Sequence, residues 1–464
     1  MPPPVVYNWT GFYLGGNVGV SAGYDPLTQT SAFPPGPISV INQSSHDPFG
    51  AIGGVQAGYN WQSGSMVLGV EGDFQFSGQT SDPTCLTFCD FNFQNPSNIQ
   101  FDSVKQSIGW FATLRGRVGY AAGPALFYLT AGAAVADIKT DYSTSQFARF
   151  AGTASDTKTG LAVGGGIEGA LYGNWTAKIE YLYLDYGSIS DSFSYTAGGG
   201  APVVSVVAGS VHDHTARLGL NYRFGEPVPK VAPVMLTKAP VMPATYNWSG
   251  FYLGGNVGYS VGRDPTSQDT FGLFGEGHNK FTLVPHGWLG GVQAGYNWQL
   301  DHWVLGLEGD YQFADQNDTA CFNWCFASNT TYNQSLRWFA TGRARVGVAA
   351  GPALFYVTGG AAWTAIRTSA SIVNTFTGAT AGSFTNSMSG WVVGGGVEGA
   401  LAAHWTAKVE YLYMDFGSFT NLFPGAPALS NLADPNVHAT SSVRDSIFRV
   451  GLDYHFGGPV VASY

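Results

Sequence analysis

The chain has 464 residues, of which 11% are charged and 15% aromatic, and 64 of them are glycine. Typical soluble proteins carry roughly 25% charged residues and disordered chains are poor in aromatics, so the composition argues against both classes. The net charge of −10 argues against nucleic-acid binding, and no apolar run is long enough for a membrane-spanning helix.

The chain begins with a short Pro-rich stretch, residues 1–6, which resembles the end of a second Pro-rich stretch at 226–245. No basic region and no apolar core precede the first repeated block. We therefore expect that a secretory signal peptide has been removed or precedes this start.

Residues 7–225 alternate between apolar and polar positions, which is typical of β-strands with two different faces. Within 66–76, for example, Leu68 and Val70 share one face while Glu71 and Asp73 share the other. The sequence predicts eight strands in this half, at 10–22, 50–62, 66–77, 105–120, 125–139, 158–172, 175–187 and 213–224. Short and long connections alternate between them, with long loops expected at 25–48, 78–103, 140–156 and 188–211.

Strands of about ten residues with short turns on one side and long loops on the other indicate a transmembrane antiparallel up-and-down β-barrel. Aromatic residues lie beside the short turns and the ends of the repeat, as expected for a girdle at the periplasmic interface: Trp9, Phe12, Tyr59, Trp61, Tyr120, Trp175, Tyr222 and Phe224. A soluble barrel would need a more highly charged surface than this chain can supply.

The alternation directs nearly balanced charges into the lumen, and unpaired charges would be costly there. We therefore predict an ion-paired, plugged lumen rather than a channel. In the first half the inward residues are Glu71, Asp73, Arg115, Arg117, Glu168, Lys178, Glu180, Arg217 and Arg223; in the second they are Glu308, Asp310, Arg343, Arg345, Glu398, Lys408, Glu410 and Arg449.

Four cysteines form two C-x3-C pairs in polar stretches: Cys85 with Cys89, and Cys321 with Cys325. Close spacing in loops favours local disulfides in an oxidising compartment, with free thiols as the alternative. No histidine stands at a ligand spacing that would indicate zinc.

The second half repeats the first in order. Residues 7–19 match 246–258, the block GGVQAGYNWQ occurs at 53 and 290, and a block of 25 residues beginning at Val163 matches one beginning at Val393. The predicted organisation is a residual leader (1–6), a first barrel (7–225), a periplasmic linker (226–245), a second barrel (246–457) and a tail (458–464). A single sixteen-stranded barrel is the alternative, but a barrel seam needs only a short turn rather than a long Pro-rich segment.

Two motifs suggest other chemistry. Residues 164–169 and 394–399 fit G-x-G-x-x-G, but they lie inside alternating strands and lack the strand-to-helix context of a dinucleotide site. The His212-Asp213-His214 triplet could suggest a metal, yet the second copy has Arg444-Asp445-Ser446 in its place. We therefore predict no catalytic residue, no metal and no cofactor, and the chain is not expected to be an enzyme.

Several blocks together resemble the porin-like small outer-membrane immunogenic proteins of alphaproteobacteria. They are YNWTGFYLGGNVG, GVQAGYNWQ, VLGVEGDFQ, GPALFYLTAG, GGGIEGAL, WTAKIEYLYLDYG and a closing strand that ends in Tyr-Arg-Phe. The resemblance covers nearly the whole chain, once per repeat. The chain differs from the family in carrying two copies and in continuing beyond Phe456, so that either Phe456 or Tyr464 could supply the terminal aromatic signal for assembly.

The resemblance implies two eight-stranded barrels in the outer membrane of a Gram-negative cell, exposed as a surface antigen and supporting the envelope. The expected partners are outer-membrane lipid, the barrel assembly machinery and an unknown surface ligand of the long loops. No residue here secures the haemin or small-solute handling associated with some members. The functional alternative is a diffusion porin formed by a sixteen-stranded pore.

Overall fold

The computed structural model describes residues 7–33, 38–85, 102–144, 149–196, 200, 202–224, 246–272, 275–324, 328–374, 378–401, 404–424 and 437–456. This part of the chain is β-structure joined by turns, and it contains no helix long and apolar enough to cross a membrane. The linker and both chain ends lie outside it.

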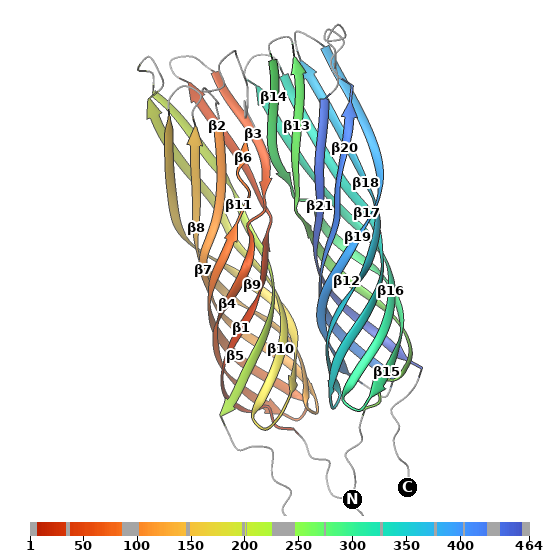
Figure 1. The fold of residues 1–464 in the computed structure, drawn as a ribbon. Coiled ribbons are helices and arrows are strands. Elements are labelled where there is room, and N and C mark those ends of the chain that lie inside the picture. Colours follow the sequence, from red (N-terminus) through yellow and green to blue (C-terminus); the bar gives the residue numbers. More distant parts are fainter. Residues whose placement is uncertain are drawn as a thin grey trace, which may run out of the picture.

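The first repeat closes into a barrel of eight antiparallel strands (Figure 1). They are β1 (Gly11–Gly23), β4 (Phe49–Ser63), β5 (Met66–Thr80), β7 (Asp102–Ala122), β8 (Ala125–Thr144), β9 (Phe150–Ala170), β10 (Trp175–Thr196) and β11 (Pro202–Phe224). Each strand pairs with the next, and β11 pairs back with β1 from Phe12 opposite Phe224 to Gly23 opposite Asp213.

The second repeat closes in the same way. Its barrel strands are β12 (Gly250–Gly262), β15 (His286–Leu300), β16 (Trp303–Trp324), β17 (Ser328–Ala350), β18 (Ala353–Asn374), β19 (Gly378–Ala400), β20 (Trp405–Phe423) and β21 (Val437–His455). β21 returns to β12, with Tyr252 opposite His455. The structure therefore contains two eight-stranded barrels, side by side and pointing the same way in Figure 1, and the sixteen-stranded alternative is wrong.

All sixteen predicted strands are present, but most continue beyond their predicted outer ends. The long loop expected at 25–48 contains a hairpin of β2 (Asp25–Phe33) and β3 (Ile38–His46), which adds to β11. The second repeat has the matching hairpin of β13 (Asp264–Gly272) and β14 (Gly275–Leu283), and a short β6 (Thr84–Cys85) follows β5. Much of the segment expected as a loop at 188–211 is likewise strand, as β10 and β11 continue through it.

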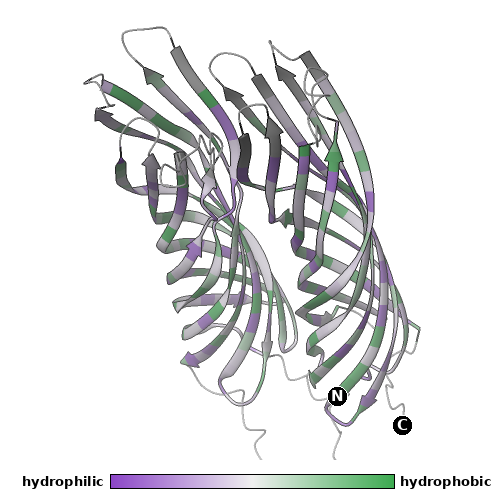
Figure 2. Cartoon of the chain, turned by 45° about the horizontal axis from the view of Figure 1, so that its top comes forward, coloured by the Kyte–Doolittle hydropathy of each residue, from purple (hydrophilic) through white to green (hydrophobic). Residues whose placement is uncertain are grey.

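The barrel wall changes polarity partway along its length. Near the short turns the outward side chains are apolar, as at Leu114 and Leu161, which are 68% and 65% exposed. Farther out on β9, Thr153 and Thr157 are the exposed side chains. An apolar band of about ten residues per strand is what a tilted strand needs to cross a bilayer, so the outer half of each barrel stands in the extracellular space. Figure 2 shows hydrophobic and hydrophilic positions alternating along the strands.

The polarity of the inward side chains also changes along the barrel, but in the opposite direction to that of the outward ones. Charged residues fill the membrane half, whereas the outer half of the first barrel is packed with apolar side chains such as Phe111, Leu182, Tyr186 and Phe193. The outer half is therefore built like a water-soluble barrel with a hydrophobic core. This explains why the strand prediction stopped early, because it rested on apolar residues facing outward.

Candidate functional site: the ion-paired lumen

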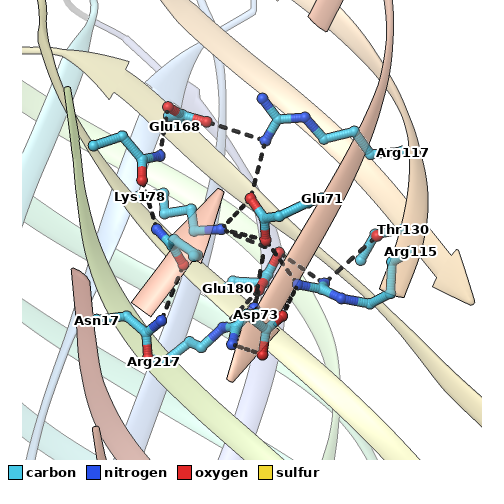
Figure 3. Close-up of polar contacts among 12 residues, drawn as sticks. Asn17, Glu71, Asp73, Arg115, Arg117, Thr130, Glu168, Lys178, Glu180 and Arg217 are labelled. Carbon is cyan, nitrogen blue, oxygen red and sulfur yellow. Dashed lines mark hydrogen bonds and ion pairs between the residues drawn. The ribbon is translucent and has the colours of Figure 1, made fainter. Parts of the chain in front are cut away.

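The charged layer of the first lumen is assembled from five strands. β5 supplies Glu71 and Asp73, and the neighbouring β7 supplies Arg115 and Arg117. β9 adds Glu168, β10 adds Lys178 and Glu180, and β11 adds Arg217. Because alternate side chains point the same way along a strand, all eight charged side chains face the interior, where they form one network of contacts (Figure 3).

Every basic side chain of this layer contacts at least one carboxylate. Arg115 lies 2.7 Å from Glu71, 2.8 Å from Asp73 and 3.1 Å from Glu180. Arg217 lies 2.9 Å from Asp73 and 2.5 Å from Glu180. Lys178 Nζ lies 2.8 Å from Glu71, and Arg117 lies 3.2 Å from Glu168. The four acidic and four basic groups cancel, and their side chains are 0–1% exposed.

Neutral side chains donate further hydrogen bonds to these carboxylates. The Tyr13 hydroxyl donates to Glu71 at 2.7 Å, and the Tyr128 hydroxyl donates to Glu180 at 2.9 Å. Thr176 and Asn221 donate to Glu168 at 2.5 and 3.0 Å. Buried charges are tolerated only when they are paired and hydrogen-bonded, and the four carboxylates of this lumen meet both conditions. The two tyrosines were not predicted as lumen residues, although Tyr13 shares its inward parity with Asn17 on β1, and Tyr128 shares its inward parity with Thr130 on β8.

The second lumen repeats the arrangement with one change. Arg343 contacts Glu308 and lies 2.9 Å from both Asp310 and Glu410. Arg345 lies 3.1 Å from Glu398, Lys408 lies 2.8 Å from Glu308, and Arg449 lies 2.5 Å from Glu410.

The change is that Asp453 and His455 replace Asn221 and Arg223 of the first repeat. Asp453 lies 3.7 Å from Lys408, and His455 Nε2 lies 3.0 Å from Glu398. Both residues belong to the network and were missed. They could have been predicted, because Asp453 and His455 alternate to the same inward face of β21 as Arg449.

Arg223 lies apart from the buried layer, at the mouth beside the short turns. Its guanidinium sits 5.1 Å from the Tyr7 ring centroid and 5.3 Å from that of Trp9. Trp9 is fully buried and donates its indole N–H to the Gly123 carbonyl at 3.2 Å. The placement of Trp9 in the outward girdle is therefore wrong: it precedes β1 and turns inward to close the mouth, as Trp248 does in the second barrel. The other predicted girdle residues lie on the barrel strands, and Trp61, Tyr120 and Phe224 are exposed there.

The remaining candidates are the histidine triplet and the cysteines. No group of three His, Cys, Asp or Glu side chains could hold a metal there. His212 lies beside Asp185 partway along β10 and β11, and His214 stacks on Tyr259 of the second repeat. Cys321 accepts a hydrogen bond from Thr331, while Cys89 and Cys325 lie outside the described residues, so the disulfides remain a prediction.

A closed antiparallel barrel with an apolar outer band, aromatic residues at its rim and a charged interior defines an integral outer-membrane protein. The family model for the outer membrane protein beta-barrel domain matches residues 1–224 and again 231–456. The chain therefore belongs to this family, carries the domain twice, and resides in the bacterial outer membrane.

Individual relatives match one repeat at a time. The 31 kDa outer-membrane immunogenic protein of Brucella melitensis is 34% identical over 48% of this chain and 86% of its own length. The 22 kDa outer membrane protein of Rhizobium leguminosarum is 33% identical over 47% of this chain and 79% of its own. Among solved structures, Neisserial surface protein A shares 14% identity over 46% of this chain and 98% of its own, with a TM-score of 0.23.

Proposed function

We propose that the protein is a non-conducting structural module of the outer membrane, whose extracellular halves present an antigen-like interaction surface. The observation that carries this proposal is the buried, charge-balanced layer across each lumen. An aqueous channel would leave these charges in contact with water, yet Arg115, Lys178 and Arg217 have side chains that are 0% exposed.

Two further layers support a sealed barrel. Trp9 and Tyr7 close the periplasmic mouth of the first barrel, and apolar side chains fill its outer half. The porin alternative depended on a sixteen-stranded pore, which the strand pairings do not form. In this proposal the barrels provide a stable and rigid base, and the outer loops bind any ligand at the cell surface.

The same proposal names the partners. Outer-membrane lipid covers the apolar band, and the barrel assembly machinery inserts the chain. Nothing in the relatives' names points to catalysis, and we propose a non-enzymatic role.

Planar bilayer recordings test this proposal. The purified protein is expected to give no large, steady conductance at neutral pH. A large, stable conductance that changes on Arg115→Ala would contradict the sealed lumen, because Arg115 would then line a water-filled path.

A further inference from the structure

Several apolar side chains that point away from the lumens are nevertheless buried. Ile167 on β9 and Ile179 on β10 alternate with the inward residues Glu168 and Glu180, so they face outward, yet they are 2% and 4% exposed. They form one cluster with Val397 of the second repeat. Outward residues elsewhere on the band are largely exposed, so what covers this face is the other barrel.

The contact within this cluster is reciprocal. The Phe127 ring of the first repeat lies against Gly399 of the second, so closely that a side-chain carbon on Gly399 would come within 2.5 Å of it. The equivalent Phe355 lies against the equivalent Gly169, where such a carbon would come within 2.9 Å. These glycines end the two G-x-G-x-x-G motifs, so close packing of the barrels accounts for glycine at this position.

The backbones of the extracellular ends also pair reciprocally between the two repeats. Strand β3 pairs with β16 at Gln43 opposite Cys321, and β14 pairs with β6 at Lys280 opposite Cys85. Gln43 and Lys280 occupy equivalent positions in the two repeats, as do Cys85 and Cys321. The first hairpin of each repeat therefore reaches across to the sheet of the other.

Side chains at the level where β1 and β12 end follow the same pattern. The Tyr24 and His286 rings lie with their centroids 3.5 Å apart, and the equivalent pair places Arg263 over Phe49 at 5.9 Å. Ala22 and Val261, which are also equivalent, pack in one cluster.

Polar contacts at the same level also join the two barrels. Arg263 contacts Asp47 and lies 3.0 Å from Asp82, and Ser45 donates to Asp318 at 3.0 Å. Each of these contacts joins one repeat to the other.

We propose that each repeat carries a self-complementary docking face, formed by the outward side of β8, β9 and β10 and by the first hairpin, and that its partner is the other repeat. An interface in which residue i meets j and the equivalent j meets i is the signature of two-fold symmetry. The duplicated chain is thus an intramolecular dimer: the docking face, rather than the linker, holds the barrels together.

The test cuts the linker of the full, folded protein. A protease site placed within 226–245 is cleaved in mild detergent, and the two halves are followed by size-exclusion chromatography, with heat-modifiable migration on gels as the check of folding. We expect the cut halves to stay folded and to elute together. Separation of folded halves would overturn the proposal.

A matched pair of variants isolates the docking face. Gly169→Trp with Gly399→Trp introduces bulk where the rings of the other repeat lie, so most of the co-elution should be lost after cleavage. Gly16→Trp with Gly255→Trp adds the same bulk on the outward face of β1 and β12, away from the cluster, and should leave the halves together. Equal behaviour of the two variants would contradict the role of the Phe–Gly contacts.

A cross-link gives an answer that does not depend on tolerance of tryptophan. In a chain whose four native cysteines are replaced by serine, Phe127→Cys with Gly399→Cys should be joined by a short bismaleimide cross-linker in isolated outer membranes, because the Phe127 ring spans the gap between the two positions. Phe127→Cys with Gly16→Cys serves as the control and should not be joined. Absence of the first cross-link in folded protein would overturn the arrangement.

Discussion

Glu71 is the carboxylate with the most cationic neighbours in the first lumen, since it contacts Arg115, Arg117, Lys178 and Arg217. Glu71→Gln keeps the shape of the side chain but leaves one positive charge uncompensated in a buried layer. Breaking a buried ion pair in this way costs about 3–5 kcal/mol of unfolding free energy. Urea unfolding in micelles, followed by tryptophan fluorescence, measures the loss.

Asp156→Asn is the control for that variant. Asp156 pairs with Lys158 at 3.3 Å, and both side chains are partly exposed. An exposed pair contributes about 1 kcal/mol or less. If the two variants destabilised the protein equally, the lumen charges would have to be in contact with water.

His46 provides a pH dependence at the same scale. It lies at the end of β3 in the extracellular half, and burial lowers its pKa from 6.5 to about 4. Between pH 6.5 and 4, His46 is protonated in the unfolded chain but neutral in the folded chain. Its contribution to the free energy of unfolding is therefore fully present above pH 6.5 and is lost as the pH falls toward 4. The loss is roughly 3 kcal/mol by pH 4 for a shift of this size.

Leucine occupies the equivalent position, 283, in the second repeat, and His46→Leu is therefore the natural comparison. Thermal unfolding, read as loss of heat-modifiable migration, should show a smaller decrease on acidification for His46→Leu than for the unsubstituted protein. Parallel decreases would mean that His46 is solvated rather than buried.

At the scale of single strands, bulges set which face points inward. On β10 the pairing with β11 shifts between Asp185 and Ser188, and Gly187 adopts a φ of 73° there. Leu184 and Tyr186 face inward before the shift, and Ile189 and Phe193 face inward after it. The bulge thus keeps apolar residues inside although their parity changes. The matching Gly417 on β20 has a φ of 77°.

Gly187→Val should therefore destabilise the outer half of the first barrel, because L-residues pay about 1–2 kcal/mol in the left-handed region and β-branched ones more. Gly187→Asn should be better tolerated, since asparagine visits that region. Limited proteolysis of the extracellular half in whole cells compares the two variants. Equal sensitivity would show that the bulge does not need a positive φ.

The membrane half of each strand was predictable, and the extracellular half was not. On β9 the alternation of Leu161 and Val163 with inward positions marks a lipid-facing strand, whereas Thr153, Ser155 and Thr157 read as a polar loop. The same pleat continues through both, but the polarity of its faces reverses at the membrane surface. A strand prediction that relies on apolar residues facing outward therefore ends at the membrane surface, although the strand continues beyond it.

The lumen residues were predictable from parity alone, because the charges stand on regular strands whose facing is fixed by the pleat. Trp9 was misplaced because it precedes β1, where no strand fixes its direction. The contacts between the barrels could not be predicted either: Phe127 and Gly399 are far apart in sequence, and each reads as an ordinary outward residue of its own strand.

At the scale of the whole molecule, the central feature is a pair of barrels that each close on themselves. Phe12 lies opposite Phe224 in the first seam, with ring centroids 5.6 Å apart, and both side chains face outward. A sixteen-stranded barrel would instead place the strand of Phe224 beside β12, near Phe251. The two topologies therefore predict different neighbours for one residue.

Disulfide trapping at that residue is the most direct measurement. In a chain freed of its native cysteines, Phe224→Cys is combined either with Phe12→Cys or with Phe251→Cys, and the cross-link is identified by mass spectrometry of outer-membrane protein. Two closed barrels predict a cross-link between positions 12 and 224 and none between 224 and 251. The reverse pattern would contradict the account.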